Sequence, residues 1–78
     1  PETIIEYHVP QTGAVKIEIY NLLGQKVKTL VDAVHPQGTY RAHWDGSTDT
    51  GIRATTGIYI YRLQAKGASV TKRMTLVK

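Results

Sequence analysis

The chain of 78 residues contains no cysteine. This absence excludes disulfide bonds, thiolate metal sites and a cysteine nucleophile. A domain of this size buries only about 60% of the surface that its unfolded chain exposes, so its core must be thin. Side-chain packing and sheet hydrogen bonds alone therefore have to hold the fold, and we expect neither a catalytic cleft nor a bound cofactor.

Long apolar runs are also missing. No run approaches the roughly 20 residues of a membrane-spanning helix, and the N-terminus shows no basic segment followed by a long apolar one. We therefore expect no membrane span and no N-terminal export signal in these residues. The chain opens at Pro1, without a methionine, directly in a strand-like pattern. We interpret it as a module excised from a longer secreted protein.

Acidic residues are absent from the last third of the chain. Residues 1–49 hold 4 Lys/Arg and 6 Asp/Glu, a charge of −2, whereas residues 50–78 hold 6 Lys/Arg and no acid, a charge of +6. The basic character thus belongs to the terminal part. Basic residues interleaved with aromatics can bind single-stranded nucleic acid, but packing explains Tyr59 and Tyr61 better, and we expect no nucleic-acid partner.

Apolar residues alternate with a period close to two, which is typical of strands. In the clearest strand Val15, Ile17 and Ile19 share one face. The other predicted strand segments are 3–9, 25–32, 40–44, 57–65 and 68–77. Six or seven short antiparallel strands, with no helix-length period, predict an all-β, immunoglobulin-like antiparallel β-sandwich. It has no disulfide and forms one domain over residues 1–78.

Three features of this pattern go beyond simple alternation. Val27 and Leu30 lie three residues apart, which predicts a bulge or one helical turn. The segment that starts at Gly57 is apolar on both faces, so we expect a central strand that is covered on both sides. Trp44 is the only tryptophan. Because an indole can bury about 150 Å² or more, Trp44 should be the centre of the core.

The segment 45–51 is the longest predicted loop, and it offers oxygens that calcium could use, with Asp45 and Asp49 as the carboxylates. The spacing does not match the EF-hand series, so a plain turn is favoured and calcium is the weaker alternative. A catalytic pair made of the same two residues is rejected, because a solvated loop provides no cleft. The histidines are interpreted as exposed surface residues and not as a metal site. They are His8, His35 and His43.

Five segments of the chain together match the sequence pattern of a known family. They are residues 3–7 (TIIEY), 15–27 (VKIEIYNLLGQKV), 44–46 (WDG) with Gly51, 56–63 (TGIYIYRL) and 72–78 (KRMTLVK). Together they resemble the type A C-terminal sorting domain of the type IX secretion system. That family is closely similar to the immunoglobulin-like domain of the flagellar hook-capping protein. The resemblance covers essentially the whole chain in the right order.

The resemblance implies a non-catalytic C-terminal module fused to an N-terminal cargo domain. Such a module is recognised by outer-membrane secretion machinery, and a cell-surface sortase often removes it afterwards. The implied location is secreted or cell-surface, after passage through the periplasm. Five positions match the recognition features of that family: Gly57, Tyr59, Lys72, Arg73 and Lys78. Arg73 stands where a second lysine is common, which keeps the charge but changes its geometry.

A second hypothesis stays open, because fold does not fix function. The chain could be an immunoglobulin-like spacer or a carbohydrate-associated accessory module of an extracellular hydrolase. Glycan binding would then use exposed aromatic side chains, with Tyr20 and Tyr61 as the candidates. The basic residues of the terminal strand also have a structural explanation, since lysines on an edge strand discourage accidental pairing between sheets.

Overall fold

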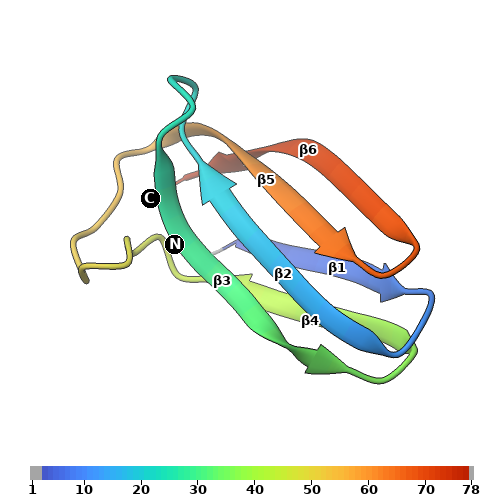
Figure 1. Cartoon of the computed structure of the whole chain (residues 1–78). Helices are drawn as coiled ribbons and strands as arrows, with labels where there is room; N and C mark the ends of the chain where they lie inside the picture. Colours follow the sequence, from blue (N-terminus) through green and yellow to red (C-terminus); the bar gives the residue numbers. More distant parts are fainter. Residues whose placement is uncertain (1–2, 78) are drawn as a thin grey trace.

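The computed structural model describes residues 3–77. Six strands form two antiparallel sheets that pack face to face (Figure 1). The strands are β1 (Thr3–Val9), β2 (Gly13–Tyr20), β3 (Lys26–His35), β4 (Gly38–Trp44), β5 (Gly57–Ala65) and β6 (Ala68–Leu76). One sheet has the order β3-β2-β5-β6, and the other pairs β1 with β4. This arrangement confirms the predicted all-β, immunoglobulin-like sandwich.

The inner faces of the two sheets meet in two clusters of buried side chains. The Tyr7 cluster comprises Ile5, Tyr7, Val9, Val15, Ile17, Ala42 and Leu63, and the Trp44 cluster comprises Ile19, Trp44, Ala54, Tyr59 and Leu76. Trp44 is fully buried, and its indole N–H donates to the carbonyl of Ser47 at 2.8 Å. A buried indole needs such an acceptor. The prediction that Trp44 lies in the core is confirmed.

Strand β3 contains two irregularities. Register shifts in its pairing with β2 leave Val27 and Leu30 unmatched in the ladder. Both side chains are half-buried and pack against the core clusters. An extra residue in one strand re-aims the side chains that follow it, so two apolar residues three positions apart can both face the core. The predicted bulge is confirmed, but the strand continues past its predicted end at Asp32 to His35.

Strand β5 lies between β2 and β6, yet only its inner face is covered. Tyr59 and Leu63 on the inner face are 6% and 3% exposed, whereas Ile58 on the outer face is 41% exposed. The prediction of a strand covered on both sides is therefore wrong. The described residues form two layers only, and the outer face of β5 becomes polar at Arg62 and Gln64 after its apolar start.

Strands β4 and β5 begin in the same way. Each opens with a glycine, Gly38 or Gly57, whose φ angle is 156° or 158°. Two residues later comes a tyrosine, Tyr40 or Tyr59, whose hydroxyl donates to the backbone carbonyl four residues earlier at 2.5 Å. A hydroxyl bonded back to the preceding backbone is the tyrosine corner of immunoglobulin-like domains. The Gly-x-Tyr pattern thus forms two equivalent corners.

Candidate recognition surface on the terminal strand

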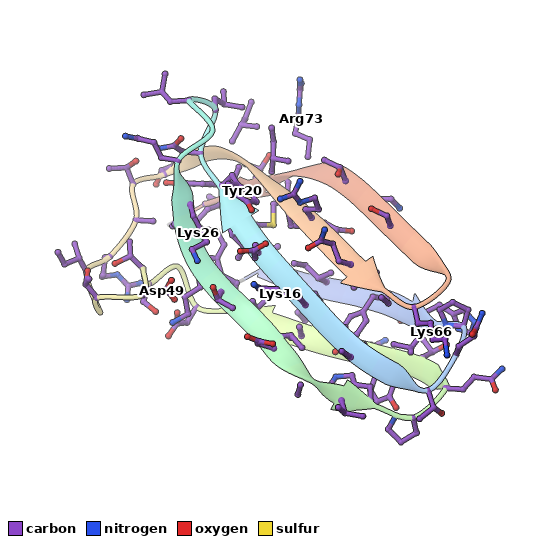
Figure 2. The ribbon with its side chains drawn as sticks, viewed as in Figure 1. Lys16, Tyr20, Lys26, Asp49, Lys66 and Arg73 are labelled. Atoms are coloured by element: carbon purple, nitrogen blue, oxygen red, sulfur yellow. The ribbon has the colours of Figure 1, made fainter. Side chains whose placement is uncertain are left out.

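The structure places three of the predicted recognition residues on the surface of one strand pair. Gly57 opens β5 directly opposite Leu76, near the end of β6. Lys72 and Arg73 lie on β6 itself, and both are exposed. Figure 2 shows Arg73 projecting outward from this strand. Lys78 lies outside the described residues, so its position is left open.

The side chain of Tyr59, the fourth predicted recognition residue that the structure describes, points into the core. Its side chain is 6% exposed, and its ring meets Trp44 edge-on, with centroids 5.1 Å apart and an interplanar angle of 79°. Such edge-to-face pairs add to the stabilisation from buried area. A partner cannot touch Tyr59 on the folded domain. Its predicted part in recognition can therefore be only a supporting one, through the packing of β5 beside β6.

Lys72 and Arg73 present positive charge on both faces of β6. Successive side chains of a strand point to opposite faces, so Lys72 has the inward register and Arg73 the outward one. Within residues 3–77, neither side chain forms an ion pair. No acidic residue occurs anywhere in residues 50–78. The last strand thus carries one cation on each face, and neither cation is ion-paired among residues 3–77.

The backbone of β6 faces solvent along one edge. The hydroxyl of Thr3 donates to the carbonyl of Thr75 at 3.2 Å, which places that carbonyl on the side away from β5. The pairing of β5 with β6 has no register shift. Because backbone groups in a strand alternate in direction, those of Thr71 and Arg73 face the same free side. The edge therefore offers a regular row of donors and acceptors.

A groove of about 300 Å³ runs beside this edge, between β6 and β1. Its lining includes the apolar side chains of Tyr7, Tyr61, Leu63 and Val70 and the charged side chains of Glu6 and Lys72. The bond from Thr3 to Thr75 also joins the two strands, and Pro10 of the groove lining lies close to Gly67 in the turn before β6. Burial raises the pKa of Tyr61, and burial together with the nearby Tyr40 raises the pKa of Tyr7.

The outer face of the four-stranded sheet carries a polar network around Tyr20. The Tyr20 hydroxyl donates to Glu18 at 3.1 Å, and Arg62 lies 5.5 Å from the ring centroid and donates to that hydroxyl at 3.1 Å. The ammonium groups within 4 Å of Glu18 belong to Lys16 and Lys26 (Figure 2). Tyr61 has the opposite register and faces inward. Tyr20 and Tyr61 therefore do not form one aromatic platform.

Asp45 and Asp49 both form hydrogen bonds that hold their own loop in place. Asp45 accepts hydrogen bonds from the backbone N–H and the hydroxyl of Ser47 at 2.9 and 2.7 Å, and these bonds lower the pKa of Asp45. Asp49 accepts from the N–H of Thr29 at 3.0 Å and donates its own N–H to the carbonyl of Val27 at 3.1 Å. The loop is thereby fixed to β3. Among residues 3–77, no three His, Asp or Glu side chains gather in a way that could hold a metal ion.

The environment of His35 differs from the exposed turn that the sequence predicts. Its ring is 4.6 Å from the ring of Tyr40 and 6.0 Å from that of Tyr7, between centroids, and its Nε2 atom is 2.9 Å from the Tyr7 hydroxyl. The interpretation of all three histidines as exposed is therefore wrong for His35. The reason is the length of β3, which carries His35 to the half-buried end of the Tyr7 cluster instead of leaving it in a turn.

Comparison with known proteins supports the fold. A family model described as the FlgD Ig-like domain matches residues 5–69. The structure of FlgD from P. aeruginosa superimposes with a TM-score of 0.77 at 19% identity, over 97% of this chain and 61% of that one. This likeness concerns the fold, and the chain spans only about three fifths of that protein. No curated protein sequence gives a significant match. None of the described residues belongs to a helix that could cross a membrane. The chain belongs to the FlgD Ig-like domain family.

Proposed function

We propose that the chain is a non-catalytic sorting module that directs a cargo protein, linked to its N-terminus, through the type IX secretion system to the cell surface. The observation that carries this proposal is the free edge of β6, where the consecutive residues Lys72 and Arg73 present positive charge on both faces and residues 50–78 of the sequence contain no acid. A sorting signal has to be accessible on the folded domain. Both cations meet that condition.

Charge on an exposed strand suits recognition by a large membrane assembly. Complementary charges raise association rates and suppress wrong partners, even where they add little affinity. The outer-membrane secretion machinery would therefore present acidic groups to β6. A surface sortase would act after translocation, on the segment that joins the module to its cargo. Membership of the FlgD Ig-like family is consistent with this proposal, because the sorting domains resemble that family.

The glycan-binding alternative has less support. An aromatic platform needs ring faces on one side of a sheet, but Tyr20 and Tyr61 lie on opposite faces. The Tyr20 hydroxyl and ring are also already engaged by Glu18 and Arg62. A spacer role needs no recognition surface at all, and it predicts that changes at Lys72 and Arg73 have no effect on export.

Export of a reporter tests the proposal. A folded reporter with its own signal for the periplasm is fused before residues 1–78 and expressed in a bacterium that has the secretion system. We expect the fusion to reach the cell surface and a fusion that lacks residues 69–78 to stay in the periplasm. Equal surface display of the two fusions would contradict the proposal.

A second pair of variants separates recognition from folding, because the truncation also removes the buried Leu76. The double variant K72Q/R73Q removes two exposed charges from β6 and should reduce export strongly. The control R41Q/R53Q removes two exposed charges elsewhere and should export normally. Among residues 3–77 this control breaks one ion pair, the surface bridge from Arg41 to Glu6, which is worth about 1 kcal/mol at most. Equal export of the two variants would support the spacer alternative.

A further inference from the structure

We propose that β6 is recognised by strand addition: an extended acidic and apolar segment of a partner protein pairs with its free edge and fills the groove between β6 and β1. Three features meet at this place. They are an unpaired backbone edge, a mainly apolar groove whose one carboxylate, Glu6, is ion-paired with Arg41, and the cation Lys72 at that groove. The inference builds on the proposed function of β6 and specifies how its partner binds.

The four-stranded sheet has two edges, and only one of them is suited to pairing. On β3, register shifts at two places break the regular ladder, and the loop residue Asp49 occupies backbone groups of Val27 and Thr29. Bulges and covering loops are known ways to protect a sheet edge. On β6 the pairing with β5 is regular, and among described residues only Thr3 bonds the outer edge, near its end. An added strand would therefore bind on β6.

The side chains of β6 that face the groove define the chemistry of the occupant. In an added strand every second residue shares the inward register of Val70, Lys72 and Met74, of which Val70 and Lys72 line the groove itself. Val70 and Met74 pack with the core clusters and favour apolar partners. Lys72 between them is exposed at the mouth of the groove. An inward-facing charge on an edge strand rejects purely apolar strands, so it selects a strand with an acid at that position.

A second copy of the chain does not fit this edge. Antiparallel pairing of β6 with itself would bring Lys72 and Arg73 of one copy next to the same residues of the other. Like charges opposite each other destabilise a sheet. No acidic residue within 50–78 could compensate. The charge pattern therefore indicates a different, acidic chain as the partner.

Peptide binding to the ¹⁵N-labelled chain tests the proposal without any secretion assay. The probe is the heptapeptide Thr-Val-Glu-Glu-Thr-Val-Ser, which in antiparallel register places valines opposite Met74 and Val70 and a glutamate opposite Lys72. We expect amide shifts in residues 69–75 and at the groove. A peptide methylated on the backbone nitrogens opposite Arg73 and Thr71 keeps its side chains but loses its donors, so it should bind about tenfold more weakly.

Two protein variants complete the test. Thr71→Pro removes one donor from the free edge and should weaken binding about tenfold, since proline is tolerated on an edge strand. Lys72→Glu should abolish binding of the acidic probe and favour a version with lysine in place of the one glutamate opposite position 72, which keeps the glutamate opposite Arg73. The chain alone should stay monomeric in sedimentation. No shift with millimolar probe, equal binding of the methylated peptide, or a dimer formed through β6 would each overturn the proposal. Loss of export in K72Q/R73Q together with any of these results would leave the sorting function standing and remove strand addition.

Discussion

The two edges of the four-stranded sheet differ in almost every respect. The edge at β3 is bulged, and a carboxylate from the loop after β4 is bonded to it. The edge at β6 is regular, borders a groove and carries Lys72 and Arg73. Sheet edges are aggregation hazards that natural proteins blunt. This small domain thus protects one edge by structure and the other mainly by charge, which leaves the second available to a matching partner.

The largest loss of stability is expected at Trp44, which contacts elements near both edges of the four-stranded sheet. The Trp44 indole holds the carbonyl of Ser47 in the loop that covers β3, and it packs in one cluster with Tyr59 and Leu76 from β5 and β6. Trp44→Ala should cost about 3–5 kcal/mol, enough to unfold a domain of this size. Urea unfolding followed by circular dichroism measures this loss. A variant that melts within a few degrees of the parent would show that Trp44 does not anchor the sheet.

A smaller difference in stability is expected between the two tyrosine corners. Tyr59→Phe removes a part-buried hydrogen bond to the carbonyl of Thr55, just before β5, and it should cost about 1–2 kcal/mol. The Tyr40 corner forms the same bond at an exposed site, where water replaces the hydroxyl, so Tyr40→Phe should cost less than about 0.5 kcal/mol. Chemical denaturation of both variants gives the comparison. Equal losses would mean that burial does not distinguish the corners.

The protection of the β3 edge should depend on one carboxylate. Asp49→Ala removes the acceptor of the Thr29 N–H, with a cost of about 1 kcal/mol. Amide exchange measured by NMR should become faster at Thr29, whereas Thr71 and Arg73 on the free edge should already exchange fast in the parent. Asp49→Asn keeps a side-chain oxygen and serves as the control. Slow exchange at Thr71 and Arg73 would contradict the assignment of β6 as the open edge.

The smallest effect is a loss of stability at high pH. Burial raises the pKa of Tyr7 and Tyr61 above the ordinary value of 10.0. A pKa that is higher in the folded state contributes stability that is complete below pH 10 and is lost as the pH rises through the folded-state value. Urea unfolding between about pH 9 and pH 11 should show this decline. The Tyr7→Phe/Tyr61→Phe variant should have a flatter profile, and an unchanged slope would exclude these two groups as its cause.

Much of the fold follows from the sequence because local signals agree with it. The alternation of Ile5, Tyr7 and Val9 specifies a strand with one buried face, and the broken spacing of Val27 and Leu30 specifies a bulge. The repeated Gly-x-Tyr pattern marks two strands that start alike. In each case the residues that carry the signal lie close together in the chain, so period and spacing suffice.

The candidate site was less predictable, because it depends on which strands become neighbours. The family resemblance implies a recognition role for Tyr59, whereas the structure packs its ring on Trp44. The groove between β6 and β1 joins residues more than 50 positions apart, such as Tyr7 and Val70. The anchoring of Asp49 to β3 likewise forms only after the sheet has assembled. Of these features, the sequence alone predicts only the positive charge of Lys72 and Arg73.

The most direct test of the account is the surface export of the K72Q/R73Q fusion relative to R41Q/R53Q, with the melting temperature of each domain measured in parallel. For a domain of this size, 1 kcal/mol corresponds to about 4–8 °C, so any loss of fold would be visible. We expect melting temperatures within a few degrees of each other and a strong loss of export for the β6 variant alone. Normal export of K72Q/R73Q at an unchanged melting temperature would contradict the claim that the free edge of β6 is the recognised part of the domain.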